Sequence, residues 1–299
     1  IYDDVLEFVK RNHTVSDVIK ATKIARNAGL KICYHIMPNL PKSDLERDLE
    51  MFKELFENPD FRPDYLKIYP LQLFKNTILF KLYEKGEFKL YSEEELVELL
   101  AKAKKFIPPY VRIQRLGRDI PLNDVDVAYP HTNLRQLVRK RAKELGISCK
   151  CIRCREVGFR IKEGIIPDLN NVKLINREYE ANNGIEIFLS FEDNKTDTIF
   201  AFLRLRIPNE SHRREIDEKS AIVRELKVLG FQVPIGKMPK KFQVQHKGFG
   251  KKLMKEAEKI ALEKFDRKKI VVISAVGTRN YYRKLEYKRE GPYMVKFLS

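Results

Sequence analysis

The sequence predicts a parallel α/β region followed by a separate α+β domain, and three observations support this division. Apolar segments of helical period alternate with short apolar strands up to residue 114. Past residue 160, β-branched and aromatic residues form consecutive strands, and a single long helical pattern follows them. The chain has 299 residues, of which 43% are hydrophobic, so it can bury two cores.

The first region alternates helices and strands, which is typical of part of a parallel α/β barrel. Ser92 followed by Glu95 forms a capping box at the start of the third helix, and Gly29 ends the first. Helices are expected over 15–28, 43–57 and 92–108, and strands over 30–38, 64–70 and 110–114.

The second region begins with two strands, which are expected to be antiparallel because the linker FEDNKTD between them has hairpin composition. The strands are expected over 184–193, 196–208, 220–230, 269–276 and 293–298. A glycine loop that runs into a helix is expected over 245–265, and a short helix over 278–287. This order predicts a compact α+β domain rather than a continuation of the barrel.

Positive charge is concentrated in the middle of the chain. The protein has 59 Lys and Arg against 42 Asp and Glu, a net charge of +17, and +10 of it lies in residues 101–160. The segment TNLRQLVRKRAKELG predicts a helix with one apolar stripe and a basic opposite face, formed by Arg135, Arg139, Lys140 and Lys143. This face suits the phosphate backbone of a nucleic acid, although a solvated charged face is the alternative.

A glycine-rich loop opens the helix that follows the third strand of the second region. It reads Gln245, His246, Lys247, Gly248, Phe249, Gly250. Glycines allow close backbone approach, and the free N–H groups of a helix start bind phosphate, so the loop fits a pyrophosphate. A tight turn would explain two glycines equally well.

The order of strand, glycine loop, helix, strand and tyrosines resembles the GNAT acetyltransferase fold. The resemblance implies that the backbone of Glu225, Leu226, Lys227 and Val228 lies along the arm of acetyl-CoA. It also implies that Tyr281 or Tyr282 approaches the sulfur, where a tyrosine can protonate a departing thiolate. Neighbouring residues of a helix point about 100° apart, so at most one tyrosine faces the thioester. Glu225 is a candidate base, with an ion pair or solvent exposure as the alternatives.

Three of the four cysteines fall within six residues, at Cys149, Cys151 and Cys154. Thiolates at this spacing indicate a zinc site, with free thiols or an iron–sulfur cluster as alternatives. Nearby basic residues would favour thiolate formation. The fourth ligand is left open, and Cys33, His35, His131 and water are the candidates. His35 ends a barrel-like strand, so it is also a candidate to face the barrel's active site or to pack in its core.

Taken together, the sequence resembles the catalytic subunit of Elongator over nearly its whole length. The acetyltransferase part rests on RELKVLG, QHKGFGKKLMKEAE and ISAVGTRNYYRKLEYKREGPYMVK. NHTVSDVIKATKIARNAGLKICYHIMPNLPKSDLERDLEMF resembles the later half of the family's radical-SAM barrel. HTNLRQLVRKRAKELGISCKCIRCREVG resembles the connection between the two. The expected parts are therefore a barrel segment at 1–118, a basic, cysteine-rich linker at 119–160 and a GNAT domain at 161–299.

The resemblance implies a tRNA-modifying enzyme that places a carboxymethyl group on C5 of the wobble uridine. It would use acetyl-CoA, and S-adenosylmethionine with a 4Fe-4S cluster for the radical step. Gly248, Phe249 and Gly250 would hold the acetyl-CoA phosphates, and the three cysteines would bind zinc. The basic linker, with Arg153 and Arg155, would face the tRNA anticodon region. The implied assembly is a homodimer or an Elongator-type complex.

Two departures from the family pattern qualify these expectations. The three-cysteine motif that would hold the cluster does not precede the barrel segment, so this chain alone is expected to lack the radical step. This first departure agrees with the start of the sequence at Ile1, which reads as mid-element and predicts a missing amino-terminal part. The second departure is in the acetyltransferase part. Lys227 and Leu229 stand where the family is expected to have His and Tyr.

Two other function classes stay open. A protein lysine acetyltransferase would share the GNAT domain but would need a neutral or acidic groove for a basic peptide. A zinc-braced, non-catalytic tRNA-binding fragment would bind no acetyl-CoA. The sequence has no apolar run approaching 18 residues and no secretory leader, so no membrane partner is expected. Four cysteines are too few for a secreted disulfide scaffold, so a cytoplasmic setting is expected.

Overall fold

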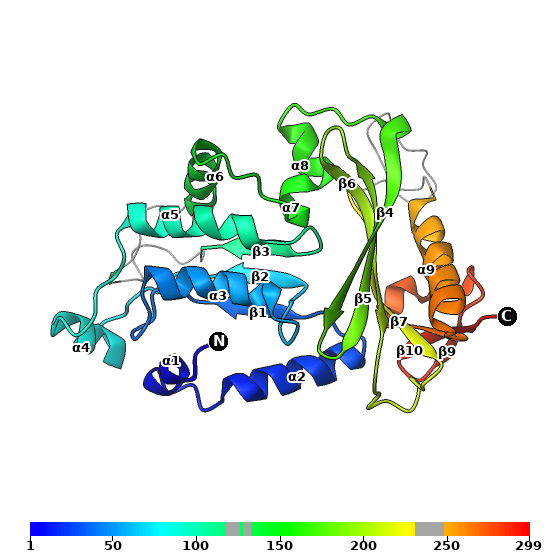
Figure 1. The fold of residues 1–299 in the computed structure, drawn as a ribbon, viewed down its shortest axis with the longest axis horizontal. Coiled ribbons are helices and arrows are strands. Elements are labelled where there is room, and N and C mark those ends of the chain that lie inside the picture. Colours follow the sequence, from blue (N-terminus) through cyan, green and yellow to red (C-terminus); the bar gives the residue numbers. More distant parts are fainter. Residues whose placement is uncertain (118–125, 128–132, 231–247) are drawn as a thin grey trace. The chain divides into compact units, whose positions relative to one another are not determined.

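The computed structural model describes residues 1–117, 126–127, 133–230 and 248–299 (Figure 1). The chain forms two compact units. The first comprises 1–19 and 33–151, and the second comprises 20–32 and 152–299. The boundary between residues 151 and 152 falls inside the expected 119–160 linker. The three-part division of the sequence remains a proposal.

The first unit is built on a three-stranded parallel sheet, as the alternating pattern predicts. The strands β1 (Cys33–Ile36), β2 (Tyr65–Ile68) and β3 (Arg112–Leu116) lie in the order β1-β2-β3. The helices and 3₁₀ turn of this unit are α1 (Asp3–Phe8), the start of α2 (Val15–Asn27), α3 (Leu45–Glu57), α4 (Ile78–Glu84), α5 (Glu93–Ala103), η1 (Lys104–Phe106) and α6 (Leu134–Glu144).

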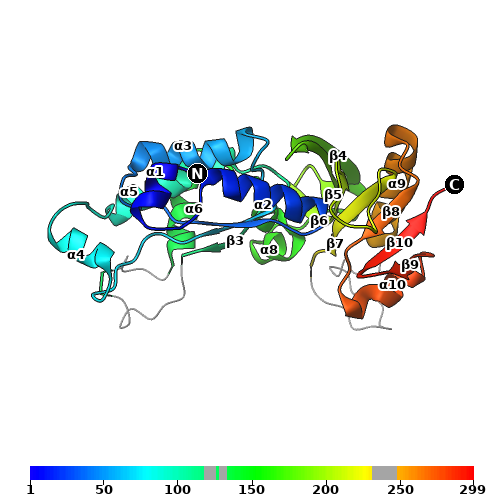
Figure 2. The ribbon, with the colours of Figure 1, turned by 90° about the horizontal axis from the view of Figure 1, so that it is seen from below.

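Helices α3 and α5 cover one face of this sheet (Figures 1 and 2). The apolar stripes of both helices are buried, with Phe52, Leu55 and Leu99 inside, and so are the strand residues Leu66 and Ile113. Helix α5 begins with the predicted capping box of Ser92 and Glu95. Helix α3 begins at Leu45, two residues later than expected, and its N-cap Asp44 accepts a hydrogen bond from the Arg47 N–H. Helix α6, expected in a linker, packs beside α5 and belongs to this unit.

The second unit contains a seven-stranded sheet in the order β4-β5-β6-β7-β8-β10-β9. All neighbouring strands are antiparallel except β7 and β8, which are parallel. The strands are β4 (Val172–Ala181), β5 (Gly184–Asp193), β6 (Thr198–Ile207), β7 (Ser220–Val228), β8 (Lys269–Val272), β9 (Lys288–Glu290) and β10 (Tyr293–Phe297). The helices and 3₁₀ turns are α7 (Ile152–Arg155), α8 (Val157–Lys162), η3 (Leu169–Asn171), α9 (Phe249–Phe265), η4 (Val276–Thr278) and α10 (Arg279–Arg283).

Helix α9 covers one face of this sheet, and its apolar stripe enters the main core. Leu253, Met254 and Ala257 pack there with Val223 and Val272. Figure 2 shows β8, α10 and β10 gathered beside α9 in the carboxyl-terminal part of the chain. The expected strand, helix, strand, helix and strand are all present, and the short strand β9 between α10 and β10 is an addition that the sequence analysis did not predict.

The sequence analysis missed strand β4. It pairs with β5 along its whole length through a two-residue turn at Asn182 and Asn183. Both asparagines have positive φ, +47° and +58°, which suits the tight turn of a hairpin. Gly184 follows because a Cβ there would stand 2.6 Å from the Arg206 guanidinium. The pair of asparagines before glycine was the available signal.

Candidate functional site

The backbone ladder between β7 and β8 ends before β7 does. Val223 pairs with Val272, and the Ile273 N–H donates to the Val223 carbonyl at 3.3 Å as the last bond of the ladder. Strand β7 continues to Val228 and stays paired with β6 on its other side. We call Glu225–Val228, with residues 273–276 opposite, the fork. Within the described residues, no strand pairs with the β8 side of Glu225–Val228.

Helix α9 begins beside the outer end of the fork. Its first intrahelical bond runs from the Lys252 N–H to the Gly248 carbonyl at 3.1 Å, so the N–H groups of Phe249, Gly250 and Lys251 have no partner within the helix. Gly248 occupies the N-cap with φ of +80°, a conformation that glycine adopts without strain. Gln245, His246 and Lys247 lie outside the described residues.

The two tyrosines of α10 take different environments, as their angular separation predicts. Tyr282 is only 6% exposed and packs in the main core, where burial and the neighbouring Tyr281 raise its pKa to about 12. Tyr281 is 39% exposed, and partial burial raises its pKa as well. Tyr281 is therefore the tyrosine available to a ligand.

Gly250 lies close to both the Tyr281 hydroxyl and Leu226 of the fork. A Cβ built on Gly250 would lie 2.7 Å from the Tyr281 hydroxyl and 3.8 Å from a methyl group of Leu226. The start of α9, Tyr281 and β7 therefore converge at one point, and only glycine leaves room for the hydroxyl there.

Glu225 does not present a free carboxylate to this site. Its Oε2 accepts a hydrogen bond from the Nε of Arg204 on β6 at 3.0 Å, and both side chains are nearly buried. The Arg204 guanidinium also lies over the rings of Phe188 and Phe202. The geometry therefore favours the ion-pair alternative over a catalytic base.

The cysteine trio is brought together. The sulfur atoms of Cys149, Cys151 and Cys154 all lie within 4.8 Å of one another, and Cys151 is fully buried. A tetrahedral site with zinc–sulfur bonds of about 2.3 Å separates its sulfurs by roughly 3.8 Å, so the three thiols fit one metal ion.

The fourth ligand is not found among the described residues, since Cys33 and His35 do not join the trio. The Cys33 thiol instead faces Gln114 Oε1 at 3.9 Å, and burial raises its pKa. The His35 ring makes an edge contact with Tyr69, and the residue helps to line a cavity of about 380 Å³ in the first unit. His131 lies outside the described residues.

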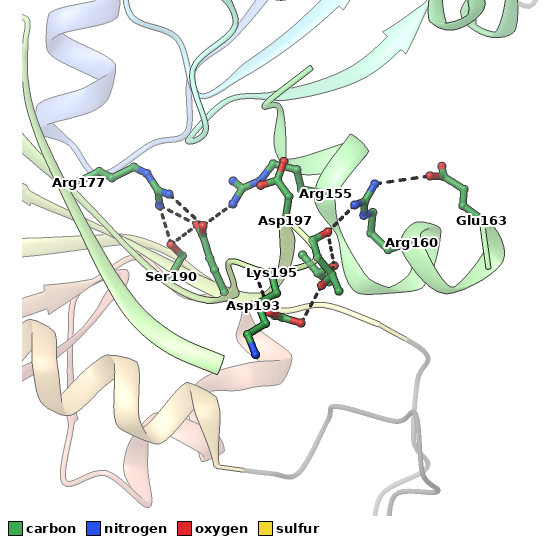
Figure 3. A network of polar contacts seen from close by, with 11 residues as sticks. Arg155, Arg160, Glu163, Arg177, Ser190, Asp193, Lys195 and Asp197 are labelled. Carbon is green, nitrogen blue, oxygen red and sulfur yellow. Dashed lines mark hydrogen bonds and ion pairs between the residues drawn. The ribbon is translucent and has the colours of Figure 1, made fainter. Parts of the chain in front are cut away.

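Arg155, expected at the tRNA surface, is buried, and this expectation was wrong. Its Nε donates to Asp197 at 2.7 Å, and its Nη2 pairs with Glu192 on β5. Figure 3 shows Arg155, Arg177 and Ser190 converging in this network. Arg177 donates to both oxygens of Glu192 at 2.7 and 2.9 Å, and Ser190 donates at 2.6 Å.

Glu192 is charged in this environment although it is buried. Burial opposes ionisation, but the hydrogen bonds from Arg177 and Ser190 and the charge of Arg155 outweigh it, so its pKa is held below the ordinary value. Because Arg155 directly follows Cys154, the network fixes the chain just after the cysteine trio to the sheet. Arg153 lies over the Phe159 ring at 4.2 Å and is only partly buried.

The basic helix α6 has the two faces that the sequence predicts. Leu134, Val138 and Ala142 are buried, whereas Arg139, Lys140 and Lys143 are exposed. Arg135 is half-buried and donates to the Gln114 carbonyl at 3.4 Å. The exposed basic face therefore contains Arg139, Lys140 and Lys143 but not the expected Arg135.

One protein-family model matches part of the first unit. Residues 63–144 match the family model described as the Radical_SAM C-terminal domain. The chain is 51% identical over 300 residues to a tRNA uridine(34) acetyltransferase of Methanocaldococcus jannaschii, covering 100% of this chain and 56% of that protein. It is 47% identical over 302 residues to Elongator complex protein 3 of Homo sapiens, covering 100% of this chain and 54% of that protein.

A solved structure agrees with these likenesses. The archaeal Methanocaldococcus infernus Elp3 with an N-terminal deletion (1-46) has a TM-score of 0.94 and 49% identity, and the match covers 100% of this chain and 70% of that chain. The chain spans little more than half the length of the curated relatives it matches. Among the helices that the structure describes, none has the length and apolarity needed to cross a membrane.

Proposed function

Since the chain belongs to the family of Elongator complex protein 3 and the tRNA uridine(34) acetyltransferases, we propose that it binds acetyl-CoA and tRNA for modification of the wobble uridine. It carries the acetyl-CoA-dependent part of an acyltransferase that works on tRNA. Membership of an Elongator-type complex, and contact with the anticodon region, belong to the same proposal.

The observation that supports this proposal most strongly is the fork beside the start of α9. The arm of acetyl-CoA contains amide groups, and the Glu225–Val228 edge, which has no neighbouring strand among the described residues, offers a strand backbone for pairing. The N–H groups that open α9 suit the diphosphate at the other end of the arm. One ligand therefore satisfies both sets of backbone groups.

Tyr281 is the proposed proton donor at the acyl end. When water cleaves the thioester, a carbon–oxygen bond forms and the carbon–sulfur bond breaks. The thiolate takes a proton from the tyrosine, and the proton that the attacking water loses returns to the tyrosinate through solvent. Burial raises the pKa of Tyr281, so the hydroxyl keeps its proton at neutral pH. Tyr282 supports it by holding α10 against the core.

Cys149, Cys151 and Cys154 are the proposed zinc ligands, because three close thiols on a short segment suit a structural metal. The metal would order the segment that connects α6 to α7. The four cysteines of this sequence offer no cluster-binding trio ahead of the sheet, so no radical step is derived from these residues. S-adenosylmethionine and a 4Fe-4S cluster, which the match to the Radical_SAM C-terminal domain supports, belong to the proposed full reaction.

The proposed tRNA surface is the exposed basic face of α6, defined by Arg139, Lys140 and Lys143. Arg153, which precedes Cys154 in the sequence, is a further proposed tRNA contact. Arg135 is half-buried on α6 and is proposed as a weaker contact. Phosphate contacts from such side chains position an RNA without reading its bases.

The proposal is tested by measuring release of CoA from acetyl-CoA with and without tRNA. We expect hydrolysis that rises when tRNA is added and that disappears at high salt, because salt weakens phosphate contacts. Acetylation of lysine peptides in the absence of RNA would contradict the proposal in favour of a protein acetyltransferase. Failure to bind acetyl-CoA at all would leave a non-catalytic RNA-binding fragment.

A further inference from the structure

Ser274 has a buried hydroxyl that no described residue uses. Its Oγ is shielded from solvent and has no hydrogen-bond partner in the described part of the chain. A buried hydroxyl without a partner lowers stability by roughly 1–3 kcal/mol. A hydrogen bond to a bound ligand would offset this cost. The residue lies two positions beyond the end of β8, in the arm of the fork that faces β7.

The strand register places Ser274 at the inner end of the fork. Val223 pairs with Val272, and a bulge at Arg224 lets Val223 and Glu225 face consecutive residues of β6. Continuing the parallel register by two residues therefore brings Ser274 level with Leu226. Glu225 is the first residue of the stretch whose β8 side has no neighbouring strand among the described residues. The hydroxyl therefore stands where the two strands part.

The alternation of side chains places Ser274 on the α9 face of the sheet. Ile270 and Val272 belong to the core beneath α9, whereas Val271 and Ile273 belong to the smaller core on the opposite face. Continuing the alternation from Val272 puts Ser274 on the α9 side. This is the same face as Leu226 and Val228, which pack toward the core under α9.

The start of α9 lies at the opposite end of the fork. The ring of Phe249, the first residue of α9, lies 4.8 Å from that of Phe191 and 6.3 Å from that of Phe200. The Phe200 carbonyl accepts from the Leu229 N–H at 2.8 Å, so these phenylalanines mark the level where β7 ends. The arm of a ligand whose diphosphate lies at the start of α9 would run along β7 from Leu229 toward Glu225. Leu226 lies about 10 Å from Leu229 along the strand, so the thioester would pass beside Ser274.

We propose that the Ser274 hydroxyl donates a hydrogen bond to the carbonyl oxygen of the acetyl thioester. This inference rests on the proposed acetyl-CoA site and adds a ligand contact to it. The hydroxyl holds the acyl group at the inner end of the fork. It also stabilises the negative charge that develops on that oxygen when water attacks the carbonyl carbon.

The test compares binding of acetyl-CoA and CoA to the 299-residue chain and to its Ser274→Ala variant. CoA keeps the diphosphate and the arm but lacks the acyl carbonyl. We expect acetyl-CoA to bind about 3- to 10-fold more weakly to the variant, with CoA affinity unchanged. Ser274→Thr, which keeps a hydroxyl, should restore most of the difference.

Thermal unfolding without ligand separates this role from a structural one. Because the hydroxyl has no described partner, Ser274→Ala should leave the melting temperature unchanged or raise it. The matched control is Thr278→Val in the same loop, whose hydroxyl already donates to the Ala275 carbonyl at 2.9 Å. It should not discriminate between acetyl-CoA and CoA.

Equal weakening of both ligands would overturn the carbonyl contact, as would unchanged binding of both or a lower melting temperature with no ligand discrimination. Each of these results leaves the proposed function standing, since the unmodified chain still binds acetyl-CoA. If the unmodified chain binds neither ligand, the proposed function fails and this inference fails with it.

Discussion

The Glu192 network and the fork differ in the hydrogen-bond partners of their polar groups. In the network, Glu192 receives hydrogen bonds from Arg177 and Ser190 and pairs with Arg155. At the fork, the edge of β7 faces no strand among the described residues, and the Ser274 hydroxyl has no hydrogen-bond partner among them. Both regions belong to the second unit and lie on strands of one sheet.

The difference teaches how to read a charged or polar residue near a suspected site. Arg155 stands beside the cysteine trio and would pass for an RNA contact by its position, yet its guanidinium is buried and paired. The same reasoning removes Glu225 from the candidate bases, since Arg204 already holds its carboxylate. Buried ion pairs of this kind hold the scaffold, although one nitrogen of Arg155, Nη1, is also buried without a hydrogen-bond partner among the described residues.

The largest expected effect on stability is in the network. Glu192→Ala should lower the free energy of unfolding by about 3–5 kcal/mol, because it leaves the buried Arg155 without one of its carboxylate partners. Urea unfolding followed by circular dichroism measures it. The control is Glu178→Ala, whose pair with Lys264 at 2.5 Å is exposed and should contribute at most about 1 kcal/mol. Equal losses in the two variants would contradict the structural role of Glu192.

The second prediction concerns the fork. Gly250→Glu should weaken acetyl-CoA binding by more than about 100-fold, because it adds a carboxylate at the proposed diphosphate site and displaces the Tyr281 hydroxyl. Equilibrium titration measures the affinity. Gly277→Ala is the matched control, since a Cβ there meets nothing within 4 Å. Unchanged affinity in Gly250→Glu would remove α9 from the site.

The third prediction uses the two tyrosines of α10. Burial raises the pKa of Tyr282 to about 12, so the folded state holds this proton more tightly than the unfolded chain does. The stabilisation is complete below about pH 10 and disappears as the pH rises from about 10 toward 12. Tyr282→Phe should flatten this alkaline decline in stability, measured by urea unfolding between about pH 8 and pH 11. Tyr281→Phe, at the more exposed position, should flatten it less.

The smallest expected effect on affinity is at the surface. Replacing Arg139, Lys140 and Lys143 with Ala should reduce the dependence of tRNA affinity on salt by about one unit of slope for each phosphate that these side chains neutralise. Filter binding at several salt concentrations gives the slope. The matched control is Lys259→Ala on α9, an exposed lysine on a different helix. A slope that stays the same in the triple variant would remove α6 from the RNA surface.

Much of the fold follows from local sequence signals, whereas the site depends on register. The capping box at Ser92 and the stripes of α6 and α9 are local, and these predicted helices are confirmed. The separation of Tyr281 from Tyr282 follows from helical geometry alone. The burial of Arg155, the pairing of Glu225 and the position of Ser274 depend on strands far apart in the chain, so no local pattern predicts them.

The central claim is that acetyl-CoA lies in the fork, and a crystal structure of the chain with CoA tests it most directly. The account predicts the arm of CoA paired with the backbone of Glu225–Val228 and its diphosphate at the N–H groups of Phe249, Gly250 and Lys251. A CoA molecule bound elsewhere, with protein residues occupying the β8 side of β7, would contradict it.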